Sequence, residues 1–99
     1  MACSPDFVRY VADQCAGAGE IKVRKMFGDC ALYVDGKLFA LVCDDALYVK
    51  PTAPGRALLP TVDLRPPYLG AKPHFFIENV DDRAFLASLV RATRSALPG

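Results

Sequence analysis

The stretch "LYVDGKLFALVCDDALYVK", residues 32 to 50, decides the fold of this 99-residue chain. Its apolar runs flank Asp35-Gly36, a pair that favours a two-residue type I′ turn because both central positions of that turn need positive φ. Asp44-Asp45 turns the chain a second time, although aspartate tolerates positive φ less well than glycine. With the residues just before it, the stretch predicts three consecutive antiparallel strands: Cys30 to Val34, Lys37 to Cys43 and Ala46 to Lys50.

The two turns also predict which side chains share a face of this sheet. The first turn places Leu32 opposite Phe39, and the second places Leu41 opposite Tyr48. One face then has no charged residue and small side chains near its centre, and we predict that it is the core face: Ala31, Tyr33, Leu38, Ala40, Val42, Leu47 and Val49. The other face is apolar too, with lysines only at its margin: Cys30, Leu32, Phe39, Leu41, Cys43 and Tyr48.

Helices are predicted at both ends of the chain. The first begins at Ser4-Pro5-Asp6, where serine can cap free amides, proline suits the first helical position and aspartate faces the positive end of the helix dipole. Its apolar residues repeat at helical spacing until Gly17. The last helix begins at Asp81-Asp82, which also offer a cap, and runs to about Leu97.

Further strands are predicted before and after the two hairpins. Residues 20–27 alternate with a period of two, and His74 to Val80 forms another strand. Six of the eight prolines lie in residues 51–73. Because proline disfavours both helix interiors and central strands, this segment is predicted to hold one helical turn at Gly55 to Leu59 and an edge strand at Arg65 to Leu69.

Composition agrees with a single small α+β domain. Apolar residues make up 53% of the chain, enough for one hydrophobic core. We predict a two-layer domain spanning residues 1–99, with the N- and C-terminal helices on one face of an antiparallel sheet of about five or six strands. No segment approaches the ~20 apolar residues that span a bilayer, and no export signal precedes the first helix, so we expect a cytoplasmic protein without a membrane partner.

The charge balance argues against direct nucleic-acid binding. With 12 basic and 11 acidic residues, the chain carries a net charge of +1 and lacks the basic excess that phosphate binding requires. One basic cluster is present near an element end: Lys22, Arg24 and Lys25, joined by Arg9. This cluster either contacts phosphate or an acidic partner, or keeps an exposed edge strand in solution.

The sequence predicts no enzyme active site, no cofactor and no metal. The four cysteines, Cys3, Cys15, Cys30 and Cys43, form no Cys-x-x-Cys pair, and His74 is the single histidine. Phosphate-loop, dinucleotide-binding and nucleophile-elbow patterns are absent. Cys30 and Cys43 are predicted one diagonal step apart on one face, which makes a redox switch the alternative to two small packing residues. We expect reduced, structural thiols.

The second apolar face needs a cover, because the helices shelter only one side of the sheet. We predict that this face binds a partner protein or a second copy of the chain as a homodimer, which makes the chain a non-enzymatic interaction domain. The other possible cover is segment 51–73, which would fold across the face in a compact monomer. The partner-binding residues would be Leu32, Phe39, Leu41 and Tyr48. The alternative is a small-molecule-binding domain whose pocket, between the sheet and segment 51–73, is lined by Phe39, Tyr48, Tyr68 and Phe76. A cysteine or metal enzyme is the third hypothesis.

A longer pattern resembles a known family. Residues 24–28 read RKMFG, residues 31–42 read ALYVDGKLFALV, and Asp44-Asp45 precedes LYVK at residues 47–50. Together these strings resemble the N-terminal domain of the TfoX competence regulators, the TfoX/Sxy family. The resemblance extends from about residue 5 to residue 50, and the remainder of the chain is similar in layout only.

The resemblance implies a two-layer α+β fold and a role in regulation. Long members of the family join this domain to a C-terminal helical domain and help to switch on competence genes together with other regulators. Because this chain ends at Gly99, we expect a single-domain member. The family offers no catalytic residue to carry over. Phe75-Phe76 and the prolines of segment 51–73 depart from the family pattern.

Overall fold

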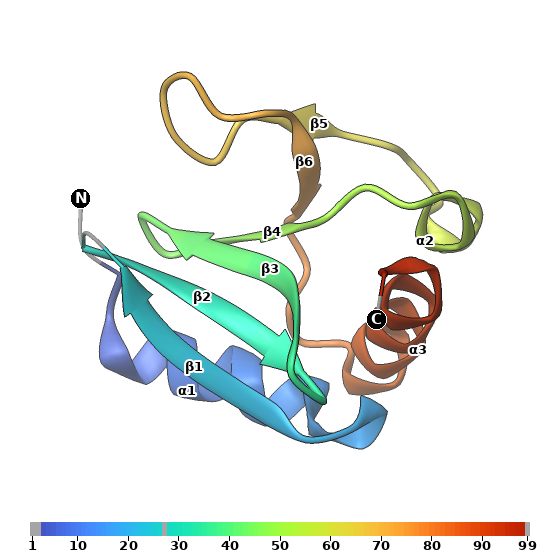
Figure 1. Cartoon of the computed structure of the whole chain (residues 1–99), viewed down its shortest axis with the longest axis horizontal. Helices are drawn as coiled ribbons and strands as arrows, with labels where there is room; N and C mark the ends of the chain where they lie inside the picture. Colours follow the sequence, from blue (N-terminus) through green and yellow to red (C-terminus); the bar gives the residue numbers. More distant parts are fainter. Residues whose placement is uncertain (1–2, 27, 99) are drawn as a thin grey trace.

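In the computed structural model, which describes residues 3–26 and 28–98, six antiparallel strands form one sheet (Figure 1). The strands are β1 (Ile21–Met26), β2 (Asp29–Val34), β3 (Lys37–Cys43), β4 (Ala46–Val49), β5 (Leu64–Arg65) and β6 (His74–Ile77). The helices are α1 (Pro5–Cys15), α2 (Ala53–Leu58) and α3 (Arg83–Ala96), with the 3-10 turn η1 (Ala16–Ala18) after α1. The sheet order is β1-β2-β3-β4-β6-β5, so β1 and β5 are its edges. The predicted α+β class and strand number are confirmed.

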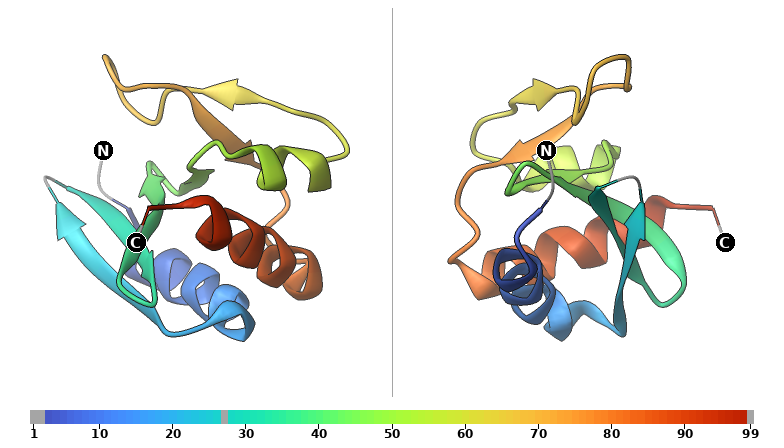
Figure 2. Two further views of the ribbon diagram at one scale, coloured as in Figure 1. Left: turned by 45° about the vertical axis from the view of Figure 1, so that its right-hand side comes forward. Right: turned by 90° about the vertical axis from the view of Figure 1, so that its left-hand side faces the viewer.

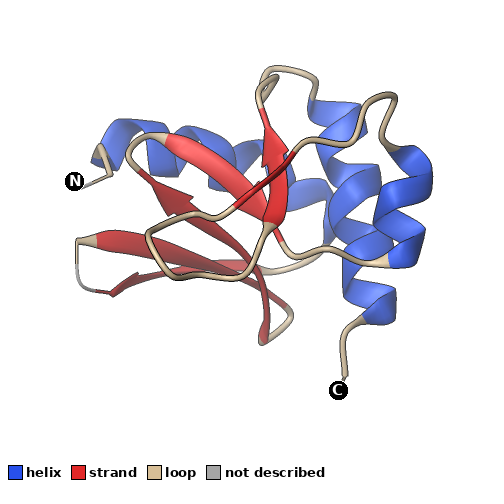
Figure 3. Cartoon of the chain, turned by 90° about the horizontal axis from the view of Figure 1, so that it is seen from above, coloured by secondary structure: helices blue, strands red, loops and turns tan. Residues whose placement is uncertain are grey.

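The terminal helices cover one side of the sheet, as predicted. In Figure 1, α1 lies behind β1 and β2. The left view of Figure 2 shows α3 between α1 and α2, and α3 packs against both. Figure 3, a view from above, shows the helices and the strands as two distinct groups. The core between the two layers draws on both terminal helices and four strands: Val8, Val11, Cys15, Leu32, Val34, Phe39, Ala40, Val42, Leu47, Val49, Phe75, Leu86, Leu89 and Val90.

Both terminal helices begin at the predicted caps. The Ser4 Oγ accepts a hydrogen bond from the Phe7 amide at 3.4 Å, and an Asp82 carboxylate oxygen accepts one from the Phe85 amide at 3.0 Å. Each bond satisfies an amide that the first helical turn leaves without a partner. The helix α3 has 14 residues. Among the described residues, no helix is both long enough and apolar enough to cross a membrane.

Both hairpin turns adopt the geometry that their sequences predict. The backbone φ is +49° at Asp35 and +83° at Gly36, and it is +52° and +54° at Asp44 and Asp45. All four residues are therefore in the left-handed region that a type I′ turn requires. The three predicted strands of the opening stretch are β2, β3 and β4. The strand β1 lies within the predicted strand 20–27, whose Phe27 is outside the described residues.

A β-bulge in β3 changes the register that the first turn predicts. Next to the turn, Tyr33 pairs with Leu38 as expected, but the register shifts at the following step and Leu32 pairs with Ala40. Phe39 is the extra residue on the bulged strand. Because the side chains of a strand alternate between two faces, one extra residue reverses the face of every β2 position beyond it relative to β3.

The bulge corrects the predicted assignment of the two faces. On β2, the side chains of Cys30 and Leu32 join the core, whereas Ala31 and Tyr33 face the other side; the prediction for this strand was wrong. Phe39 is also fully buried in the core, contrary to its predicted place. Leu38 pairs with Tyr33 outside the core, so its predicted core position was wrong. The predictions for β3 beyond the bulge and for β4 are confirmed: Ala40, Val42, Leu47 and Val49 are core residues.

The proline-rich segment 51–73 contributes one element to each layer. Its helical turn is α2, which packs on α3 through the buried Gly55. A Cβ on Gly55 would lie 3.4 Å from both Leu89 Cδ1 and Thr93 Oγ1, so glycine permits this close approach. An edge strand is present, but β5 covers Leu64–Arg65 and shares only Arg65 with the predicted range Arg65 to Leu69; it pairs with β6 at the end of the sheet. The helix α2 therefore lies on the helix side and β5 lies within the sheet, so neither element covers the opposite face.

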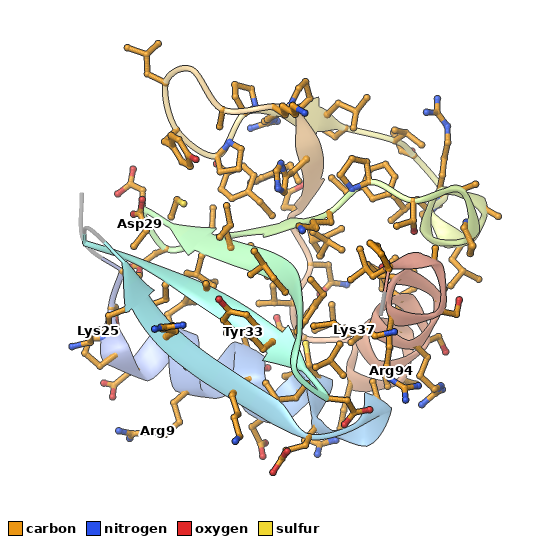
Figure 4. The ribbon with its side chains drawn as sticks, viewed as in Figure 1. Arg9, Lys25, Asp29, Tyr33, Lys37 and Arg94 are labelled. Atoms are coloured by element: carbon orange, nitrogen blue, oxygen red, sulfur yellow. The ribbon has the colours of Figure 1, made fainter. Side chains whose placement is uncertain are left out.

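The tip of the β2–β3 hairpin forms polar contacts with the residue before β1 and with the end of α3. One Asp35 carboxylate oxygen accepts a hydrogen bond from the Glu20 amide at 2.9 Å, and the other forms an ion pair with Arg94 Nε at 2.8 Å. The Lys37 Nζ donates to the Leu97 carbonyl at 3.4 Å. Figure 4 shows Lys37 and Arg94 close together at the end of α3. The hairpin tip and the last turn of α3 therefore hold each other in place.

Candidate interaction surfaces

The side of the sheet without helices, called the open face below, carries a group of partly exposed apolar side chains. Strand pairing places them on five neighbouring positions of four strands: Tyr33, Leu38, Leu41, Tyr48 and Phe76. Figure 4 shows Tyr33 in front of the sheet, on the side away from α1. Aromatic residues are enriched in the centres of protein interfaces because they bury a large area with few rotatable bonds.

The far end of the open face is built around Phe76. Its ring lies 5.6 Å from the Tyr48 ring, centroid to centroid, and the Arg65 guanidinium carbon lies 4.1 Å above its centroid. Asp63 holds Arg65 in place with hydrogen bonds of 3.0 and 2.8 Å, and this contact raises the pKa of Arg65. The open face therefore combines aromatic rings with a positioned cation.

Half of the predicted partner-binding set lies on the open face. Leu41 and Tyr48 pair with each other there, as predicted, and both are partly exposed. Leu32 and Phe39 are fully buried in the core, so they cannot contact a partner of the folded chain. Sequence reasoning missed three residues of the face. Tyr33 and Leu38 pair as predicted next to the turn, but they had been assigned to the core face. Phe76 reaches the open face because β6 pairs with β4.

The predicted basic cluster lies along the edge strand β1, and it divides between the two sides of that strand. Lys22 and Arg24 pair with Tyr33 and Ala31 on the side of the open face, whereas Lys25 pairs with Cys30 on the helix side. Figure 4 shows Lys25 and Arg9 at the same margin of the molecule, where α1 runs beside β1. Arg9 approaches Asp6 at 4.0 Å, and both side chains are largely exposed.

A groove of about 290 Å³ separates α1 from the β1 edge. Its lining is apolar apart from two cations: Cys3, Pro5, Val8, Arg9, Ala12, Val23, Lys25 and Cys30. Val8 and Cys30 are buried, whereas Val23 keeps 44% of its surface exposed at the strand edge. An exposed valine beside an apolar groove is a site where a partner side chain could be buried.

A second cavity, of about 420 Å³, lies between β6, the start of α3 and the segment that follows α2. Apolar residues and three carboxylates line it: Leu58, Leu59, Pro60, Thr61, Asp63, Phe76, Ile77, Glu78, Asn79, Asp82 and Phe85. A pocket between the sheet and segment 51–73 is therefore present. Of the four lining residues predicted for it, only Phe76 is correct. Tyr48 is absent from the lining, Phe39 is in the core and Tyr68 is exposed on the β5–β6 connection.

The buried thiols are held in their neutral form. Burial raises the pKa of Cys15 and Cys43 to about 12 and that of Cys30 to about 11, with Asp29 adding to the effect at Cys43. Since the thiolate is the reactive form, these three thiols are poorly suited to nucleophilic chemistry near neutral pH. Cys30 pairs with Val42 rather than Leu41, so Cys30 and Cys43 lie on opposite faces, contrary to the prediction.

Metal ligands and the histidine are also dispersed. The described residues contain no group of three or more His, Cys, Asp or Glu side chains placed to share a metal ion. The Nδ1 of His74 lies 2.9 Å from the Lys72 carbonyl oxygen. Within the described ranges, the apolar open face, the basic edge and the two cavities are therefore the features from which a function can be argued.

An open antiparallel sheet backed on one side by its N- and C-terminal helices defines a small two-layer α+β domain. The model of the TfoX N-terminal domain family matches residues 13–96, so the chain belongs to this family. The chain is also 35% identical over 99 residues to an uncharacterized 12.7 kDa protein encoded in the trpE 5′ region of Spirochaeta aurantia. That match covers 99% of this chain and 86% of the Spirochaeta protein.

Proposed function

We propose that this TfoX N-terminal domain is a non-enzymatic, regulatory interaction domain that associates through its open face. The observation that carries the proposal is the group of partly exposed apolar side chains on the side of the sheet that no described helix covers. In a chain of this size, the hydrophobic effect favours the burial of such a group against another surface.

A second copy of the chain is the partner that we propose first. Two-fold contacts are the commonest form of assembly, because one self-complementary patch supplies both halves of the interface. The open face suits such a contact, since its centre is apolar and its cations lie toward the margins, at Lys22, Arg24 and Arg65. A different regulatory protein, of the kind that TfoX regulators act with, is the alternative partner.

The test compares two lysine substitutions by light scattering at several protein concentrations. Leu41→Lys places a charge at the centre of the open face, and Leu69→Lys places the same charge on a fully exposed leucine of the β5–β6 connection. We expect the wild-type chain and the Leu69→Lys control to dimerise and Leu41→Lys to be monomeric, with an unchanged circular dichroism spectrum. A wild-type chain that is monomeric at every concentration would reject the second copy as the partner. A dimer that survives Leu41→Lys would reject the open face.

Small-molecule binding is the second candidate function, and the cavity of about 420 Å³ favours it. This volume suits a small ligand, and the lining combines apolar side chains with the carboxylates of Asp63, Glu78 and Asp82. Amines are therefore the first ligands to screen. A true ligand raises the melting temperature with increasing concentration by mass action, and Leu58→Arg, at an exposed wall of the cavity, should abolish the rise. An amine screen without any concentration-dependent shift would count against this function.

A further inference from the structure

We propose that the β1 edge and the groove beside α1 bind an extended acidic segment of another protein, which adds to the sheet as a further strand. This inference goes beyond the open-face association, because it concerns a different surface and a different partner. It rests on three independent features of the molecule: an available strand edge, an apolar groove alongside it, and cations on both sides of the strand.

The available edge is β1, the long outer strand of the sheet. It has six residues, Ile21–Met26, and within the described ranges β2 is its strand neighbour. In an antiparallel ladder, alternate residues direct their N–H and C=O groups away from the neighbouring strand. The outer side of β1 therefore offers main-chain groups for pairing, as in other cases of strand addition. The opposite edge, β5, has two residues and is too short to serve as a template.

The groove supplies a place for the side chains of the added strand. On β1, the residues that point to the helix side are Ile21, Val23 and Lys25, since these pair with core-facing positions of β2. A strand added outside β1 would direct every second side chain to the same side, between β1 and α1. There, the exposed part of Val23 and the apolar wall at Ala12 would bury an aliphatic side chain.

The charges decide the chemistry of the partner. Arg9 and Lys25 line the groove, and Lys22 and Arg24 lie on the other side of β1, so acidic side chains on either side of an added strand would meet a cation. A second copy of β1 is disfavoured. Because three of its six residues are basic, an antiparallel β1–β1 pair would place like charges opposite each other. The partner is therefore a different, acidic segment.

The experiment uses the full chain and two fluorescein-labelled seven-residue peptides, one alternating valine with glutamate and the other alternating valine with lysine. Fluorescence anisotropy should show saturable, salt-sensitive binding of the glutamate peptide alone. Amide chemical shifts should change along Ile21–Met26 and the facing side of α1. The double substitution Arg9→Glu with Lys25→Glu should weaken the binding of the glutamate peptide by about tenfold or more. It should also create affinity for the lysine peptide.

Two controls separate the possible failures. Arg56→Glu removes a cation of α2 that lies outside the groove lining, so it should leave the affinity unchanged. Leu41→Lys tests the open face and should also bind the glutamate peptide normally, so the two proposals can fail separately. No binding of the glutamate peptide up to about 1 mM, equal binding of both peptides, or amide shifts confined to residues outside β1 and the facing side of α1 would overturn the inference. The cations would then serve only to protect an exposed edge from aggregation.

Discussion

Replacing Asp35 tests whether the hairpin tip and α3 stabilise each other. This residue combines three features: a backbone φ of +49°, a 2.9 Å hydrogen bond from the Glu20 amide and a 2.8 Å ion pair with Arg94. Asp35→Ala removes both contacts and places a Cβ-bearing residue without a local polar partner in the left-handed region. Asp35→Asn keeps an oxygen for the Glu20 amide and tolerates positive φ, so it removes the ion pair alone.

The contacts of Asp35 determine how much unfolding free energy each variant should lose. The ion pair is partly exposed, with 45% and 36% of the two side chains accessible, and such pairs contribute about 0.2–1 kcal/mol. The hydrogen bond contributes about 1 kcal/mol. Because Asp35 already bears part of the left-handed cost of about 1–2 kcal/mol, its replacement by alanine adds only the remainder, about 0.5 kcal/mol. We therefore expect Asp35→Ala to lower the free energy of unfolding by about 2 kcal/mol and Asp35→Asn by less than about 1 kcal/mol.

Urea denaturation measures both values, provided that the m-value stays constant. A double-mutant cycle of Asp35→Ala with Arg94→Ala isolates the ion pair, and its coupling energy should be about 0.5 kcal/mol. Equal losses for Asp35→Ala and Asp35→Asn would refute the reasoning, because the ion pair alone would then account for the whole effect. A loss below about 1 kcal/mol for Asp35→Ala would refute it as well.

Three further predictions concern the core. Gly55→Ala brings a Cβ to 2.9 Å from Thr52 Oγ1 and crowds α3, so its unfolding free energy in urea should fall by about 1–3 kcal/mol. Phe39→Ala, at the bulge, should lower the same quantity by about 3–5 kcal/mol, whereas a change near zero would place Phe39 on the surface after all. Burial raises the pKa of the Cys15 thiol from 9.0 to about 12, so the unfolded chain releases this proton at lower pH than the folded chain. Stability should therefore fall as the pH rises through this range, and Cys15→Ala should make the melting temperature fall less steeply between about pH 9 and pH 11.

Local chemistry made most of the fold predictable. The Asp35-Gly36 and Asp44-Asp45 turns, the Ser4 cap and the Asp82 cap each depend on a few adjacent residues, and the structure confirms them. The bulge at Phe39 could not be predicted in this way. Strands β2 and β3 are apolar at nearly every position, so no charged residue marked which side faced water. The register shift brings Cys30, Leu32 and Phe39 into a core that also contains residues of α1 and α3, which lie far away in the sequence.

The surface residues were predicted less completely, for a related reason. Leu41 and Tyr48 follow from a regular ladder next to a turn, and they were placed correctly. Leu32 and Phe39 lie at the bulge, and they were predicted on the wrong face. The basic residues of β1 do lie on an edge strand, which was one of the two explanations that the sequence left open for the cluster. The groove beside β1 depends on how α1 lies against the sheet, which spacing in the sequence does not encode.

The part that α3 takes in the core has a consequence for biosynthesis. The hairpins are synthesised early and can pair locally, but Leu86, Leu89 and Val90 of α3 complete the core. Until these residues leave the ribosome, the inner side of the sheet remains uncovered in the nascent chain, where chaperones can bind it. Folding of this domain is therefore completed only after α3 has emerged from the ribosome.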